Sequence, residues 1–234
     1  MSLERLTEAL QMAQWLPQQK QFFEKWQSYV LPATIVEGTG ITVTHDEDLG
    51  TLTLATTVPT VVGKHAVPVM APAILPRQTS GCASLAYLSG ASNQPDVAYL
   101  AFDFTTAEYA QFAIVMPSSW NEGTVTFVPH WSHPATATNF GVVWKLRAVA
   151  VSNDDTLAVS YGTIQSSTDT GGTTNDYYAG PESAAITVAG TPAAGDLVYF
   201  EIGRDPAEAA DTLGVDAYLI GITIYVTTAA ATDT

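Results

Sequence analysis

The sequence predicts a mainly β protein: an antiparallel β-sandwich of jelly-roll type, preceded by a short N-terminal helical segment and a β-hairpin. The spacing of apolar residues is helical up to about residue 30 and has a period of two after Pro32. From residue 64 onward, short apolar runs alternate with Gly, Pro and Asn turns, which is typical of sandwiches. We therefore expect a helical anchoring segment (1–32), a hairpin with a linker (33–63) and a sandwich domain (64–234).

The N-terminal segment has an apolar stripe at helical spacing. The residues of this stripe that we expect to serve in anchoring or oligomerisation are Leu3, Leu6, Leu10, Trp15, Phe22, Phe23 and Trp26. Pro17 divides the segment into two short helices, because proline suits the first turn of a helix and not its interior. Helices of this length are unstable alone. The stripe therefore needs a cover, which is the chain's own sandwich, sister chains or a docking partner.

The second segment has the pattern of a β-hairpin. Ile41 and Val43 in one run, and Leu52 and Leu54 in the next, alternate with polar residues, and acidic residues and a glycine lie between the runs. A two-stranded hairpin is only marginally stable in water, so we expect it to pair with copies of itself or to lie on a larger sheet. We expect a homotrimer with residues 3–56 near its axis, because neither the stripe nor the hairpin has an obvious partner in its own chain.

Nine strands are expected in the sandwich domain, each a short apolar or alternating run bounded by turn residues. They are residues 65–70, 97–104, 109–116, 124–131, 140–151, 157–160, 185–188, 197–203 and 215–226. Asp103, Glu108 and Glu201 alternate with apolar neighbours, so we interpret them as solvent-facing strand or turn residues.

Two long polar stretches, 165–181 and 204–211, are expected to be loops, where contacts with other molecules commonly lie. In the first of them the candidate ligand-binding residues are Asp169, Asp176, Tyr177 and Tyr178. Ordinary turn chemistry is the alternative role for the aspartates. Trp120 and Trp131 are further aromatic candidates. An aromatic side chain that is exposed can stack on a sugar ring, whereas a buried one belongs to the core.

The charge distribution excludes several partners. The net charge is −15, and 20 of the 23 acidic residues but only five of the eight basic ones lie after residue 30. Such a surface repels nucleic acid and anionic lipid, so we expect neither as a partner. No stretch has the ~18 consecutive apolar residues that span a bilayer, so no membrane insertion is expected. The N-terminus lacks the apolar run of a secretory signal, and the single cysteine excludes an intrachain disulfide, so we expect assembly in a cytoplasm.

Motifs that carry catalysis or hold cofactors are missing from the sequence. There is no Gly-x-Ser-x-Gly elbow and no phosphate-binding loop. His130 and His133 are two potential ligands where a structural zinc site needs four. The acidic cluster at 153–155 does not match a calcium-binding loop of the EF-hand type. We therefore expect no metal, no cofactor and no enzymatic activity.

Several linked motifs between residues 74 and 226 resemble a widespread family of tailed-bacteriophage structural proteins. They are Tyr109-Ala-Gln-Phe, Met116-Pro-Ser-Ser-Trp-Asn-Glu-Gly-Thr-Val, Asn139-Phe-Gly-Val-Val-Trp, Ser152-Asn-Asp-Asp, Thr168-Asp-Thr-Gly-Gly, Gly195-Asp-Leu-Val-Tyr-Phe, Arg204-Asp-Pro and Asp211-Thr-Leu-Gly-Val-Asp. In addition, Gly38-Thr-Gly-Ile-Thr-Val-Thr with Gly50-Thr-Leu-Thr-Leu resembles a β motif near the N-termini of phage fibre proteins. The resemblance implies a component of the virion exterior, often a symmetric oligomer, and supplies no catalytic residues.

Two functions follow from the resemblance as expectations. The first is a capsid decoration (cement) or head-fibre protein that docks on other virion proteins, such as the major capsid protein, through its N-terminal segment. The alternative is a tail-fibre or spike subunit that attaches to tail components and binds a host-surface glycan through the 165–181 loop. In both cases the protein is expected on the virion exterior after assembly in the host cytoplasm, and head and tail remain open.

Overall fold

The computed structural model describes residues 41–46, 51–56, 63–134, 140–230 and 233, and the chain divides into two compact units at residue 60. In the first unit, β1 (Ile41–Asp46) and β2 (Thr51–Thr56) pair antiparallel, with Val43 opposite Leu54 and His45 opposite Leu52. The predicted hairpin is therefore confirmed. The helical stripe from Leu3 to Trp26 lies outside the described residues, and the homotrimer stays a prediction.

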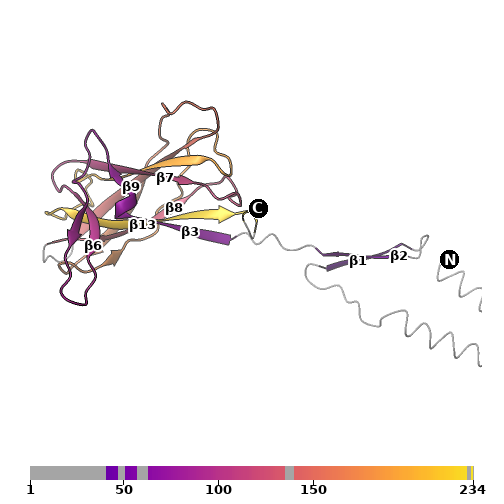
Figure 1. Cartoon of the computed structure of the whole chain (residues 1–234), viewed down its shortest axis with the longest axis horizontal. Coiled ribbons are helices and arrows are strands. Elements are labelled where there is room, and N and C mark those ends of the chain that lie inside the picture. Colours follow the sequence, from indigo (N-terminus) through magenta and orange to yellow (C-terminus); the bar gives the residue numbers. More distant parts are fainter. Residues whose placement is uncertain (1–40, 47–50, 57–62, 135–139, 231–232, 234) are drawn as a thin grey trace, which may run out of the picture. The chain divides into compact units, whose positions relative to one another are not determined.

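The second unit is a sandwich of two antiparallel sheets (Figure 1), which confirms the predicted fold class. The five-stranded sheet has the order β10 (Gln165–Gly171), β9 (Phe140–Val151), β12 (Leu197–Arg204), β7 (Glu108–Val115), β4 (Leu75–Pro76). The six-stranded sheet has the order β11 (Tyr178–Ala179), β8 (Thr126–Ser132), β13 (Ala217–Thr228), β6 (Val97–Phe102), β5 (Ala86–Leu88), and β3 (Gly63–Met70) also pairs with β13. A 3-10 turn, η1 (Ala71–Ala73), joins β3 to β4.

The core lies between the sheets and follows from the alternation of apolar residues along the strands. On β8, Phe127, Pro129 and Trp131 are buried, while Val128 and His130 between them are partly exposed. The facing sheet contributes Trp144 of β9 and Phe200 of β12, both fully buried. Burial of each such side chain stabilises the fold by roughly 1.5–3 kcal/mol. The single cysteine, Cys82, is also buried, and burial together with the negative charge of Glu108 raises the pKa of its thiol to about 12.

The predicted loop at 165–181 is wrong in its first part. Residues 165–171 form β10, which pairs with β9 along its whole length, from Gln165 opposite Leu146 to Gly171 opposite Phe140. The edge of β9 presents backbone donors and acceptors that need partners, and a Ser- and Thr-rich strand satisfies them without an apolar stripe. The short strands β4, β5 and β11, of two or three residues each, were also not predicted.

Two predicted strands, 157–160 and 185–188, are not strands in the described structure. In the first, Leu157 is 73% exposed on the outside of the sandwich. In the second, Ile186 forms an isolated bridge with Val125, in which each N–H donates to the carbonyl of the other. Apolar residues in short runs also occur where irregular backbone packs onto a sheet, so periodicity alone does not identify a strand.

The predicted loop at 204–211 begins with a buried ion pair. Arg204, the last residue of β12, is fully buried, and its Nε and Nη2 donate to the two carboxylate oxygens of Asp211 at 3.0 and 2.8 Å. The remaining donors reach backbone carbonyls of Phe102, Leu213 and Val215. Both ends of the 204–211 stretch are therefore held against the core, so the segment is not a free loop.

Candidate functional site

An apolar groove opens on the six-stranded sheet where β13 changes its neighbour. β3 pairs with β13 from Gly221 onward, whereas β6 pairs with β13 only up to Leu219. Ile220 lies between these two stretches, and the pairing of β13 with β8 shifts register at the same point, as in a β-bulge. The groove, of about 490 Å³, is therefore a consequence of the strand exchange.

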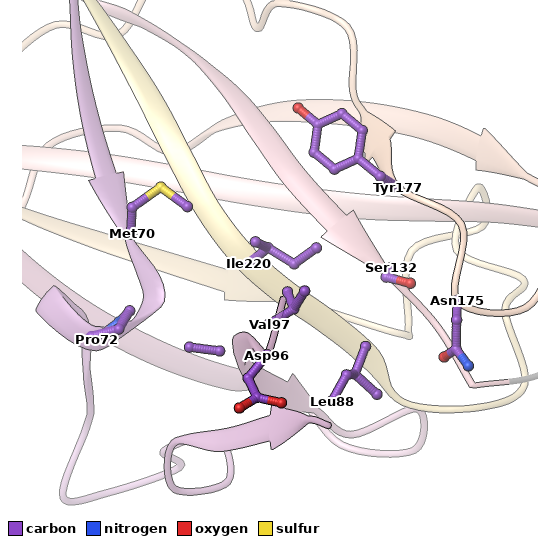
Figure 2. A pocket seen from close by; sticks show the side chains of 10 residues that line it. Met70, Pro72, Leu88, Asp96, Val97, Ser132, Asn175, Tyr177 and Ile220 are labelled. Carbon is purple, nitrogen blue, oxygen red and sulfur yellow. The ribbon is translucent and has the colours of Figure 1, made fainter. Parts of the chain in front are cut away.

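The groove combines an apolar floor with a few polar groups, as small-molecule sites do. Its apolar lining consists of Met70, Pro72, Leu88, Val97, Ala98 and Ile220. Its polar lining consists of Asp96, Ser132, Asn175 and Tyr177. Figure 2 shows Tyr177 on one side of the groove and Asp96 on the other, with Ile220 and Val97 between them.

Among the described residues, one buried polar atom of the groove lacks a partner. The side chain of Ser132 is 1% exposed, and its Oγ has no hydrogen-bond partner among the described residues. A buried hydroxyl without a partner costs about 1–3 kcal/mol, so such groups are normally satisfied by protein, water or ligand. Ser132 lines the groove, and its hydroxyl can both donate and accept a hydrogen bond.

Tyr177 is held at the edge of the groove by a stacked histidine. Its ring is 62% exposed and lies nearly parallel to that of His130, with centroids 5.8 Å apart. The hydroxyl of Tyr177 is 2.6 Å from His130 Nδ1, and Nε2 of the same histidine is 2.8 Å from the hydroxyl of Thr223. Burial lowers the pKa of His130, which favours the neutral ring. The exposed aromatic face is thus preorganised without charge.

The other predicted ligand residues of the 165–181 stretch do not share the groove. Asp169 accepts a hydrogen bond from Nε1 of Trp131 at 2.8 Å, and Tyr178 stacks on the same indole at 4.7 Å. The hydroxyl of Tyr178 accepts from two backbone N–H groups and donates to the carbonyl of Thr173. Asp176 is exposed in the adjoining turn. These residues shape the turn that carries Tyr177, and none of the three lines the groove.

Two aromatic candidates belong to the core. Trp120 and Trp131 are 3% and 0% exposed, so neither is available to stack on a sugar. The cluster at 153–155 is a turn in which the carboxylate of Asp155 accepts from the backbone of Ser152 at 3.1 Å. Within the described residues, no group of three His, Cys, Asp or Glu side chains is arranged to hold a metal ion, and no helix has the length and apolarity needed to cross a membrane.

The groove itself was not predictable from the sequence. Met70, Asp96 and Ile220 come from three segments that strand pairing around β13 brings together, and Ser132 is the last residue of β8. A bulge at Ile220 leaves no local sequence signal. Of the groove residues, only Tyr177, in a stretch rich in Gly, Thr and Asp, was predicted from the sequence as a candidate ligand residue.

No protein-family model matches the sequence, and no curated protein matches it. Among solved structures, the chain is similar to the CBM22-2 xylan-binding domain from Paenibacillus barcinonensis Xyn10C, with 14% identity, a TM-score of 0.40, and coverage of 69% of this chain and 99% of that domain. It is also similar to a family 11 carbohydrate-binding module from Clostridium thermocellum in complex with a β-1,3-1,4-mixed-linked tetrasaccharide, with 9% identity, a TM-score of 0.34, and coverage of 80% and 96%. At such TM-scores the likeness carries no information about the ligand.

Proposed function

We propose that this chain is a non-enzymatic binding protein of a tailed-phage exterior, and that its groove binds a sugar unit of a host-surface glycan. The observation that carries the proposal is the exposed side chain of Tyr177 at an apolar groove whose lining also includes Ser132, a residue whose hydroxyl has no partner in the described part of the chain. Pyranose rings present C–H groups on their faces and hydroxyls around their edges. An apolar floor with an aromatic edge and a few polar groups matches both features.

The polar groups of the groove differ in what they offer. Ser132 Oγ both donates and accepts, the side-chain amide of Asn175 does the same, and the carboxylate of Asp96 accepts from sugar hydroxyls. One oxygen of Asp96 is already fixed by the backbone N–H of Gly90 at 2.8 Å, which orients the carboxylate. The groove volume lies within the range of about 300–1,000 Å³ that is typical of small-molecule sites.

Replacing Tyr177 with alanine is expected to weaken glycan binding about tenfold, which corresponds to ~1.4 kcal/mol, because an aromatic contact with the sugar is lost. The full-length protein is first screened on a glycan array, and the strongest ligand is then titrated by calorimetry against both proteins. Because Tyr177 is exposed, the thermal unfolding midpoint should change little.

Tyr87→Ala is the matched control, since Tyr87 is also an exposed tyrosine of the six-stranded sheet and does not line the groove. Binding should be unchanged in this variant. If no glycan binds the full-length protein, or if Tyr177→Ala binds as tightly as the unaltered protein, glycan binding in the groove is refuted.

A second candidate function, capsid decoration or head fibre, is supported by the phage-protein motifs between residues 74 and 226 and by the apolar stripe of residues 1–32. In this proposal the N-terminal segment docks a trimer on the major capsid protein, and the sandwich projects outward. Immunogold labelling of intact particles with antibody against residues 64–234 separates the two. Label over the head supports decoration, label at the tail tip supports glycan attachment, and unlabelled particles contradict both virion roles.

A further inference from the structure

The outer face of the five-stranded sheet carries a second cavity, on the other sheet from the groove. Its lining, which we call the shelf, consists of Gln111, Val149, Leu157, Val159, Tyr161 and Tyr199. Strand register explains its floor, because Tyr199 of β12 lies opposite Val149 of β9, and Gln111 of β7 lies opposite Glu201 of β12. The segment that follows β9 forms the wall. The cavity volume is about 310 Å³.

A buried carboxylate beside the shelf binds two arginines. The side chain of Glu201 is 1% exposed, which corrects its interpretation as solvent-facing. Its Oε2 accepts from Nη1 of Arg77 at 2.6 Å, and its Oε1 accepts from Nε of Arg147 at 2.6 Å and contacts Nη2 of the same residue at 2.5 Å. One carboxylate shared by two guanidinium groups leaves an excess of one positive charge.

This excess distinguishes the arginine pair from the other basic side chains of the described residues. Lys64 pairs with Glu182, Lys145 with both Asp205 and Glu208, and Arg204 with Asp211, as the described ion pairs show. Each of these cations therefore has at least one carboxylate of its own. In a chain of net charge −15, a local cation excess at a cavity attracts and orients an anion.

The two guanidinium groups keep donors for a ligand. The side chains of Arg77 and Arg147 are 37% and 30% exposed, and no hydrogen bond or ion pair of Nη2 of Arg77 or Nη1 of Arg147 is found in the described part of the chain. Guanidinium groups bind carboxylates through paired, charge-assisted hydrogen bonds. Glu201 fixes both groups side by side, so little side-chain entropy is lost when a carboxylate binds.

The aromatic rings of the shelf suit a sugar. Arg147 lies over the ring of Tyr161 at 5.0 Å, which holds both side chains in place. Burial and the negative charge of Glu201 raise the pKa of Tyr161, so its hydroxyl stays protonated at neutral pH. Tyr199 and Leu157 add apolar surface on the floor and wall. The cavity therefore offers a face for a pyranose ring next to donors for a carboxylate.

We propose that the shelf is a second binding site, separate from the groove, for a carboxylate-bearing saccharide such as a uronate. The carboxylate binds Arg77 and Arg147, and the sugar ring packs against Tyr161 and Tyr199. The proposal rests on the described contacts of the five-stranded sheet alone and does not depend on the function proposed for the groove.

The test is calorimetric titration of the full-length protein at low salt with trigalacturonate, trimannuronate and sialyllactose. The methyl ester of each saccharide serves as its matched neutral ligand. At least one acidic saccharide should bind, its neutral counterpart should bind at least tenfold more weakly, and Arg147→Gln should reduce affinity about tenfold or more. Arg147→Lys keeps the charge opposite Glu201, so it should fold normally and bind with intermediate affinity.

Lys64→Gln removes the same charge from a basic residue of the other sheet and should leave affinity unchanged, as should the groove variant Tyr177→Ala. Failure of all three acidic saccharides to bind at millimolar concentration overturns the proposal. Equal binding of the ester, or loss of binding in Tyr177→Ala, also overturns it. Inorganic phosphate is titrated in parallel. If phosphate competes at the same concentration as the saccharide, the shelf binds an anion without recognising the sugar, and the proposal of a saccharide site is overturned.

Discussion

Arg204→Met is expected to lower the free energy of unfolding by about 3–5 kcal/mol, because it leaves the carboxylate of Asp211 buried without its cation. The side chains of this pair are 0% and 1% exposed. The variant also removes the donors that satisfy three backbone carbonyls at the end of the sandwich. Urea unfolding followed by tryptophan fluorescence gives the free energy of unfolding.

The exposed pair of Lys64 and Glu182 provides the control. Its two side chains are 50% and 36% exposed, so Lys64→Met should change the free energy of unfolding by less than about 1 kcal/mol. The double variant Arg204→Met/Asp211→Leu removes both charges and should recover part of the loss. A loss below about 1 kcal/mol in Arg204→Met would contradict the assigned role of the ion pair.

Trp131→Ala is expected to lower the free energy of unfolding by a similar amount, about 3–5 kcal/mol, because it opens a large cavity in the core. The indole is fully buried and contacts the rings of Phe140 at 6.2 Å, Trp144 at 6.5 Å and Tyr178 at 4.7 Å between centroids. The same urea titration measures the effect.

The loss of Trp131 should also weaken binding in the groove. Trp131 donates to Asp169 and stacks on Tyr178, the residue that follows the groove tyrosine Tyr177. Glycan affinity should therefore fall in Trp131→Ala under conditions in which the variant is still folded. Trp131→Phe keeps an aromatic ring and loses the N–H donor, so its loss of stability should be smaller. Equal stability of the alanine variant and the unaltered protein would argue against this packing.

The strands were predictable where an apolar stripe repeats over at least six residues. The prediction for 140–151 matches β9 residue for residue, and those for β3, β6, β7, β8, β12 and β13 agree within two residues at each end. In these elements one face is buried against the other sheet, so the side-chain pattern of the chain itself carries the information. The antiparallel sandwich follows from many such strands with short turns between them.

Other elements depend on what lies beside them. β10 contains no Val, Ile or Leu, and it is a strand because the edge of β9 supplies its hydrogen-bond partners. Conversely, 157–160 has apolar residues and remains irregular, because it packs over the outer face of the five-stranded sheet. Local composition does not encode a neighbour that lies far away in the sequence.

The sequence by itself determined the fold class, the hairpin, the position of most strands, and Tyr177 as a candidate ligand residue. Only the tertiary structure decided that the Ser132 hydroxyl lacks a partner among the described residues, that Glu201 is buried between two arginines, and that Tyr177 borders a groove while Tyr178 supports it. The physical reason is range: a strand's own pattern records which face is buried, whereas a binding site is made by side chains that register and strand exchange bring together from distant segments.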